Sequence, residues 1–316
     1  YALFLRIVMG GCLSLGRQSS DDRHPPADPA LVPPSPIERT GTASEAATKA
    51  PSSYLIQPGS DEAERLRQRH FTIRWALDCN FHPPIDELLN RGISVLDVGC
   101  GSAQWLLDMA EVYQTSQFYG IDIVDRFPNI HSSNLHFTVG DVRQGLPYSD
   151  DTFEFVNQSL MVMAFTDQDW TALMKELRRV CKPGAWVELM EEGLFSWSEV
   201  ERHLEENSLA MDQHGYRTHV ALSLGKTLAE AGAHTITTGF VSIPLNWGGT
   251  FGDLAMANFL RFLDLWQPWL RSIRGITAEA YKAELDVVQE ESRMYNVYLN
   301  LHYAYGQVVK DASINA

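Results

Sequence analysis

The sequence lacks two features that are typical of membrane-spanning and nucleic-acid-binding proteins. No segment carries 18 consecutive apolar residues, so we predict no membrane-spanning helix. There is no long run of lysine and arginine either: 25 basic side chains stand against 40 acidic ones, and the net charge is −15. Because phosphate binding requires a local positive field, this balance argues against direct binding of nucleic acid.

Cysteine is scarce as well. The chain has four cysteines, none of them forms a CxxC pair, and no histidine cluster accompanies them. We therefore expect neither a zinc site nor a disulfide framework. Lone cysteines in an α/β chain usually serve as small buried side chains, in a reducing compartment. We expect a cytoplasmic or nuclear location, with Cys12, Cys79, Cys100 and Cys181 outside any disulfide.

The first 53 residues differ in composition from the rest. From residue 16 to residue 53 the chain consists mainly of Pro, Ser, Thr, Ala and Asp, and seven of its 15 prolines lie between Pro25 and Pro51. Such a segment buries too little apolar surface to offset the entropy lost on ordering. We predict a disordered tail over residues 1–53 and one folded domain over residues 54–316.

The apolar opening YALFLRIVMGGCLSLG is compatible with a signal-peptide core, but it also contains a lipidation pattern. If translation starts at Met9, the chain opens with MGGCLS, which fits the signature for myristoylation of Gly10. Cys12 then lies in position for palmitoylation, and two acyl chains give stable anchoring. On this hypothesis the protein is attached to a membrane.

Strand and helix patterns alternate through the first part of the domain. An entry helix begins near Ser60, and a later helix, from Asp167 to Cys181, opens with a capping box at Thr166 and Asp169. A further helix begins at Ser102. Alternation of this kind predicts an α/β fold with a mostly parallel sheet and helices on both faces. The strands are predicted at residues 93–98, 117–122, 134–139, 152–158 and 185–190.

The alternation stops after the fifth strand. We predict a helix at 217–231, a strand at 234–245, helices at 251–270 and 277–294, and a closing strand at 296–306. The two later helices are rich in aromatic residues. We expect them to form a cap at about residues 245–294, either as a packed cover or as the lining of a substrate pocket.

The stretch VLDVGCGSAQW, residues 95–105, indicates a ligand site at the end of the first strand. Gly99 and Gly101 allow the backbone to approach a ligand closely, and the following helix offers free N–H groups. The dinucleotide pattern G-x-G-x-x-G would need glycine at Gln104, and the charge of Asp97 would repel a pyrophosphate. A carboxylate there suits a cation such as S-adenosylmethionine (SAM), which carries a sulfonium and an ammonium.

Polar residues also follow the next strands, at the edge where an open parallel sheet binds its ligand. Asp122 can accept hydrogen bonds from both ribose hydroxyls, and Asp141 from the adenine amino group. Ile123 and Val142 are predicted to pack on the adenine ring. At the end of the fourth strand we expect Asn157 and Gln158 to border the methyl group.

The motifs VLDVGCGSAQW, YGIDI, GDV, LPYSDDTFEFV and LRRVCKPGAWVELME resemble, in this order, those of the class I SAM-dependent methyltransferases. The flanking YLIQPGSDEAERLRQRHF, VSIPLNWGG and VYLNLHYAYGQ are similar to the fungal LaeA-like, TAM-domain methyltransferases. The resemblance implies a Rossmann-like sheet of seven strands with the last one antiparallel, and a helical cap before that strand. It also implies cofactor binding by Asp97, Gly99, Gly101, Asp122 and Asp141.

The predicted function is transfer of a methyl group from SAM to a small molecule or a protein side chain. The resemblance leaves open a SAM-binding regulator of secondary metabolism, which acts through protein partners and has weak or no transferase activity. A nicotinamide oxidoreductase is disfavoured by Gln104 and Asp97. His70, in the entry helix, is a weak candidate for a catalytic base. By family position alone, Tyr54 and Trp247 are expected to wall the acceptor site.

Overall fold

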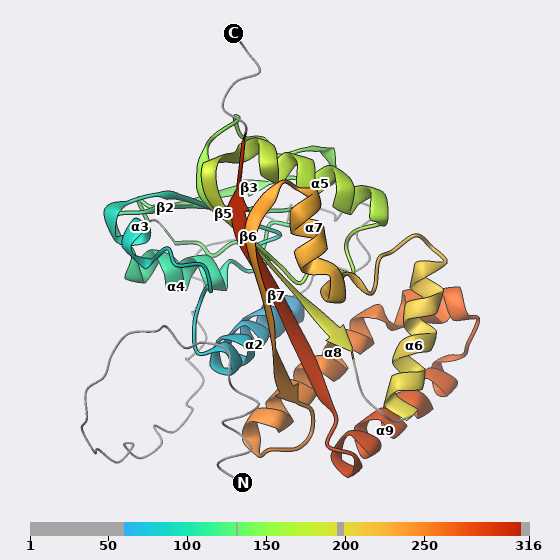
Figure 1. Ribbon diagram of the computed structural model, residues 1–316. Coiled ribbons are helices and arrows are strands. Elements are labelled where there is room, and N and C mark those ends of the chain that lie inside the picture. The colour runs from blue at the N-terminus through green and yellow to red at the C-terminus, as the bar shows by residue number, and fades with distance from the viewer. Residues whose placement is uncertain (1–59, 131, 195–198, 311–316) are drawn as a thin grey trace.

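The computed structural model describes residues 60–130, 132–194 and 199–310 (Figure 1). The predicted tail, the lipidation pattern and Tyr54 lie outside these residues. The helices and strands are α2 (Ser60–Leu77), α3 (Asp86–Arg91), β1 (Ser94–Val98), α4 (Gln104–Val112), β2 (Gln117–Asp122), β3 (Leu135–Val139), η1 (Val142–Gln144), β4 (Phe153–Ser159), α5 (Asp167–Val180), β5 (Cys181–Leu194), α6 (Glu199–Asp212), η2 (Val220–Ser223), α7 (Leu224–Glu230), β6 (Ala233–Pro244), α8 (Thr250–Arg274), α9 (Ala278–Met294) and β7 (Tyr298–Val308).

These strands form a seven-stranded sheet in the order β3-β2-β1-β4-β5-β7-β6. The strands from β3 to β5 run parallel, and β7 runs antiparallel to both β5 and β6. The predicted fold class, with an antiparallel last strand and a helical insertion before it, is confirmed. β5 is longer than expected at both ends: it begins at Cys181, which pairs with Phe153 of β4, and it continues to Leu194 alongside β7 (Figure 1).

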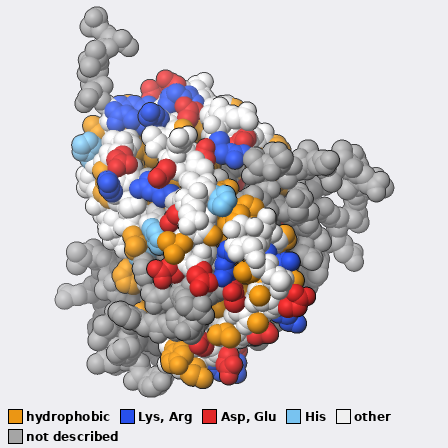
Figure 2. Space-filling model, turned by 90° about the vertical axis from the view of Figure 1, so that its right-hand side faces the viewer, with side chains coloured by type: hydrophobic (Ala, Val, Ile, Leu, Met, Phe, Trp, Pro, Cys, Tyr) orange, Lys and Arg blue, Asp and Glu red, His pale blue; other side chains and the backbone are white. Residues whose placement is uncertain are grey.

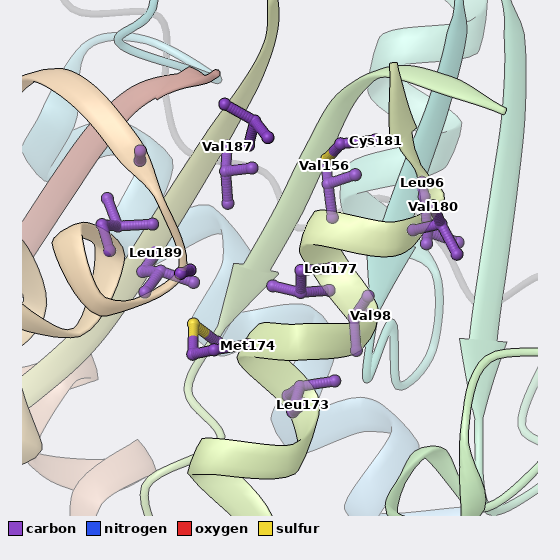
Figure 3. Packing of buried hydrophobic residues seen from close by; sticks show 14 of the residues in the cluster. Leu96, Val98, Val156, Leu173, Met174, Leu177, Val180, Cys181, Val187 and Leu189 are labelled. Atoms are coloured by element: carbon purple, nitrogen blue, oxygen red, sulfur yellow. The ribbon is translucent and has the colours of Figure 1, made fainter. Parts of the chain in front are cut away.

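Helices cover both faces of the parallel strands. On one face, α5 turns Leu173, Leu177 and Val180 toward the strand residues Val156 and Leu189 (Figure 3). The predicted capping box starts this helix: Asp169 N–H donates to the Thr166 hydroxyl, and the Thr166 N–H donates to the Asp169 carboxylate. On the other face, α3 and α4 bury a second cluster, which includes Ile85, Leu89, Leu106, Met109, Phe118 and Phe155.

The cap consists of α8 and α9, which lie next to α6 and α2 (Figure 1). The sequence predicted α8 and α9, but it did not predict α6, whose residues are mostly polar. On the side of the molecule shown in Figure 2, acidic and basic side chains lie among one another rather than in separate patches. Within the described ranges, none of the helices is both long and apolar enough to cross a bilayer.

Candidate functional site

A cavity of about 300 Å³ lies at the carboxyl ends of the parallel strands, with α2, α6 and α8 beside it. Residues from all of these elements line it. Most of the residues singled out from the sequence are brought together here: Asp97, Gly99, Gly101, Asp122, Ile123, Asp141, Val142, Asn157 and His70. The described residues contain no group of three or more His, Cys, Asp or Glu side chains placed to hold a metal ion.

The glycine turn depends on backbone conformations that side chains disfavour. Gly99 and Gly101 have φ values of +72° and +55°. A Cβ on Gly99 would lie 2.3 Å from the Met161 sulfur, so the turn also requires space there. Ala103 adopts the left-handed conformation too (φ 59°), and α4 therefore begins at Gln104, two residues later than predicted. No side chain caps this helix, so its first N–H groups are not occupied by a capping side chain.

Asp97 is buried at the floor of the cavity, with 4% of its surface exposed. Its Oδ1 accepts a hydrogen bond of 2.8 Å from the Asn157 amide. Burial raises the pKa of Asp97 to about 7, against the opposing effect of that hydrogen bond, and the charge of Asp122 adds to the rise. A cation bound beside Asp97 would favour the ionised carboxylate and so lower the pKa of Asp97.

Asp122 holds the glycine turn against the second strand. Its Oδ2 accepts from the Gly101 N–H and its Oδ1 from the Val124 N–H, both at 2.9 Å. Burial raises the pKa of Asp122, while these hydrogen bonds lower it. Each carboxylate oxygen has two lone pairs, so both retain capacity for a hydroxyl donor.

Asp141 forms an ion pair with Arg143, which the sequence analysis did not predict. Arg143 donates to Oδ1 from Nε at 2.8 Å and to Oδ2 from a terminal nitrogen at 2.7 Å. This pairing is the main cause that lowers the pKa of Asp141. The prediction that Asp141 accepts from an amino group therefore requires that it share its oxygens with Arg143.

Gln158 does not line the cavity, although it was predicted to border the methyl group. Asn157 and Gln158 are consecutive residues of β4, so their side chains point to opposite faces of the sheet. Gln158 is fully buried on the face away from the cavity, and neither polar atom of its side chain has a hydrogen-bond partner among the described residues. Trp247 was also misplaced: it does not line the cavity, and its ring N–H donates to the Val297 carbonyl at 2.5 Å.

His70 reaches the cavity wall but is already paired. Its Nε2 lies 2.9 Å from Asp108 Oδ2, an oxygen that also binds Arg74. Burial acts to raise the pKa of Asp108, but His70 and then Arg74 outweigh it and hold this pKa below its usual value. His70 therefore faces the cavity as part of an acid–base cluster at the junction of α2 and α4.

The part of the cavity under the cap is apolar and aromatic, with paired charges in its wall. Phe259, Phe262, Leu263 and Trp266 of α8 line it. The guanidinium groups of Arg65 and Arg69 lie 5.4 and 5.7 Å from the Phe262 ring centre. Arg65 pairs with Glu62 at 2.7 Å, and Arg69 donates to Glu192 at 3.1 Å. Arg65 and Arg69 are four residues apart in ERLRQRH, a spacing that places them on one face of a helix.

Residues 95–184 match a protein family described as a methyltransferase domain. The match runs from the first residues of β1 into β5 and includes the glycine turn, Asp97, Asp122, Asp141 and Asn157.

Curated relatives extend the similarity beyond that segment. The N-methyltransferase sirN of Leptosphaeria maculans is 27% identical over 227 residues, which cover 68% of this chain and 80% of sirN. The secondary metabolism regulator laeA of Aspergillus flavus is 24% identical over 279 residues, 77% of this chain and 71% of laeA. Phosphoethanolamine N-methyltransferase 2 of Haemonchus contortus, solved with S-adenosyl-L-methionine, aligns with a TM-score of 0.46 and 14% identity, over 77% of this chain and 57% of that one.

Proposed function

We propose, from the membership of this chain in the class I SAM-dependent methyltransferases, that its acceptor is a small, largely apolar molecule with a nitrogen nucleophile. The enzyme transfers the methyl group of SAM to an acceptor.

The side chains at the strand ends fit SAM. The carboxylate of Asp97 suits the ammonium, Asp122 the ribose hydroxyls, and Asp141 the adenine amino group, with Ile123 and Val142 against the ring. Gly99 and Gly101 line the cavity with backbone that carries no side chain. When bound, SAM supplies a methyl group on a positively charged sulfur, so the protein mainly has to orient the acceptor in line with it.

The apolar wall under the cap carries the acceptor proposal. The part of the cavity under the cap is lined by Phe259, Phe262 and Trp266, and an aromatic and apolar lining of this kind is typical of a site for a small organic molecule. The two arginines beside the Phe262 ring, Arg65 and Arg69, are paired with Glu62 and Glu192, so neither guanidinium is left to bind an ionic acceptor by itself. α8 of the cap packs against α2, and both helices line the cavity. The name of the relative sirN, an N-methyltransferase, favours nitrogen as the methylated atom.

A label-partition experiment tests this proposal. The protein is incubated with SAM that carries a radioactive methyl group, together with either a solvent extract or a protein extract of a fungal culture. We expect label in the solvent-extractable fraction, and none with Asp97→Asn. Label in acid-precipitable protein would contradict the small-molecule acceptor. Label in neither fraction, with intact binding of S-adenosylhomocysteine (SAH), would support the alternative of a regulator that acts through protein partners.

We also propose a cytoplasmic or nuclear location, with membrane attachment through acylated Gly10 and Cys12 where translation begins at Met9. Mass spectrometry of the mature N-terminus tests the attachment. An N-terminal Gly10 without an acyl group, or a start upstream of Met9, contradicts it.

A further inference from the structure

A cysteine, a histidine and a glutamate lie in a chain of contacts that ends at the cavity. Cys79 Sγ lies 3.8 Å from His82 Nε2, within hydrogen-bonding range for sulfur. The other ring nitrogen of His82, Nδ1, lies 2.5 Å from Glu188 Oε1. The His82 backbone N–H donates to the second oxygen of Glu188 at 3.3 Å. Cys79 lines the cavity, whereas His82 and Glu188 lie behind it.

The surroundings fix the orientation of the imidazole. The side chains of His82 and Glu188 are 5% and 1% exposed. The His82 ring stacks on Tyr303 with its centre 3.6 Å away and an interplanar angle of 10°. Since a carboxylate accepts hydrogen bonds, Glu188 holds the ring proton on Nδ1 and leaves the lone pair of Nε2 facing the thiol. A thiol that can pass its proton to an imidazole is stabilised as a thiolate.

The strand register places this group close to the cofactor end of the cavity. Asp97 of β1 pairs with Asn157 of β4, and Asn157 pairs with Glu188 of β5. Neighbouring strands are about 4.8 Å apart, so Glu188 lies roughly 10 Å from Asp97 on the same face of the sheet. The Trp105 ring N–H donates to the Asn80 carbonyl at 2.7 Å and ties the Cys79 segment to α4.

Asn80 gives a second indication of a ligand at this position. It follows Cys79 in the chain and lines the same cavity. Its side-chain oxygen is buried and accepts no hydrogen bond from the described residues. A buried acceptor without a donor is unfavourable. An N–H or O–H group on a molecule in the cavity would satisfy it, next to the Cys79 sulfur.

We propose that Cys79 is the general base of the methyl transfer, and that His82 and Glu188 are positioning residues that keep it ionised. This inference rests on the proposed function. As the acceptor nitrogen attacks, a nitrogen–carbon bond forms, the carbon–sulfur bond of SAM breaks, and its electron pair stays on sulfur. The acceptor proton moves to the Cys79 thiolate. The protonated Cys79–His82 pair then releases one proton to solvent, which balances the positive charge lost from SAM.

Alkylation of the full chain by iodoacetamide, followed by peptide mapping, tests the ionisation without any need for turnover. The other described thiols serve as internal references: burial raises the pKa of the Cys181 thiol to about 12, and burial with the charges of Asp97 and Asp122 raises that of Cys100. We expect Cys79 to react first, with a half-maximal rate at least one pH unit below the usual thiol value of about 8.5.

His82→Gln should slow alkylation of Cys79 at pH 6.5 by about tenfold, because the thiolate fraction falls more than the reactivity of the remaining thiolate rises. Glu188→Gln should shift the pH midpoint of alkylation upward. His234→Gln, at an exposed histidine of β6, is the matched control and should leave the rate unchanged. If Cys79 reacts like an ordinary thiol, or if His82→Gln has no effect on its rate, the inference is overturned.

Cys79→Ser keeps the size of the side chain but removes a group that ionises near neutral pH. In the label-partition assay we expect about a hundredfold slower transfer and an SAH dissociation constant within about twofold of wild type. Transfer at the wild-type rate with the wild-type pH profile would overturn the role of Cys79 alone. Failure of the folded wild type to bind SAH would instead contradict the proposed function, and the role of Cys79 with it.

Discussion

Asp97→Asn is expected to stabilise the free protein while it strongly weakens cofactor binding. Burial raises the pKa of Asp97 from 3.8 to about 7. Between about pH 4 and pH 7 the folded protein therefore holds a proton that the unfolded chain has released. The free energy of unfolding must fall as the pH rises through this window. At pH 8 the wild type carries the whole cost of a buried carboxylate, whereas the neutral variant does not.

The size of the effect follows from the shift. About three pKa units at 1.36 kcal/mol each give an upper bound on the order of 4 kcal/mol. The variant's amide oxygen can still accept from Asn157, so the native contact at 2.8 Å is kept. We expect urea unfolding at pH 8 to show higher stability for Asp97→Asn, by up to that amount, and little difference near pH 4. Asp253→Asn, at an exposed position in the first turn of α8, is the control.

The protonation state of Asp97 also determines the affinity of the protein for SAH. The SAH ammonium favours the carboxylate form of Asp97, which with a pKa of about 7 makes up about a tenth of the free protein at pH 6 and nine tenths at pH 8. Calorimetry should therefore give binding roughly tenfold weaker at pH 6 than at pH 8. Asp97→Asn should bind at least about a hundredfold more weakly at pH 8. A dissociation constant that does not change between pH 6 and pH 8, or a variant less stable than wild type at pH 8, would refute the reasoning.

Three further substitutions separate the roles of other residues. Gly99→Ala should lower the free energy of unfolding by about 1–2 kcal/mol through its backbone conformation, and further through the clash with Met161. It should also weaken SAH binding. Gly184→Ala, at φ +78° in open space, should show the backbone effect alone, so equal thermal stabilities of the two variants would contradict the crowding at Gly99. Glu62→Gln removes the negative charge that neutralises the buried guanidinium of Arg65, and it should lower the free energy of unfolding in urea by about 3 kcal/mol. Glu87→Gln, in an exposed pair with Arg91, should change this free energy very little. Similar losses of stability in the two variants would argue against the effect of burial. His70→Gln should keep the SAH dissociation constant within about twofold of the wild-type value, and it should lower turnover less than Cys79→Ser does. If His70→Gln has the lower turnover of the two variants, His70 is the better candidate for the base.

The cofactor end of the site was predictable because its signals are local. Asp97, Gly99, Asp122 and Asp141 each lie in or just after the last residues of a short strand, and the carboxyl ends of parallel strands meet at one edge. The same alternation of side chains could have excluded Gln158: two consecutive strand residues cannot both face the cavity. Asn157 and Gln158 adjoin in the chain, but only Asn157 presents its side chain to the cavity.

The acceptor end was not predictable in the same way. Its wall comes from α2, α6 and α8, which are far apart in the sequence and meet only in the fold. The polar α6 gave no clear periodic signal, and the pairing of Arg69 with Glu192 spans 123 positions. Aromatic residues of the cap could have belonged to a packed cover or to a pocket. The structure divides them, because Phe262 and Trp266 line the cavity while Trp247 bonds to the backbone beside α9.

The row of polar residues across the sheet shows why long-range pairing decides the chemistry. Asp97, Asn157 and Glu188 are buried in neighbouring strands, where apolar side chains would give a more stable sheet. Each acid has a partner from a distant segment: Asn157 lies 60 positions from Asp97, and His82 lies 106 positions from Glu188. Binding of SAM accounts for the burial of Asp97 but not for the burial of Glu188. The proposed role of Glu188 in orienting His82 toward Cys79 accounts for that burial. This arrangement places a proton acceptor, Cys79, on the face of the sheet where the methyl group is to be transferred.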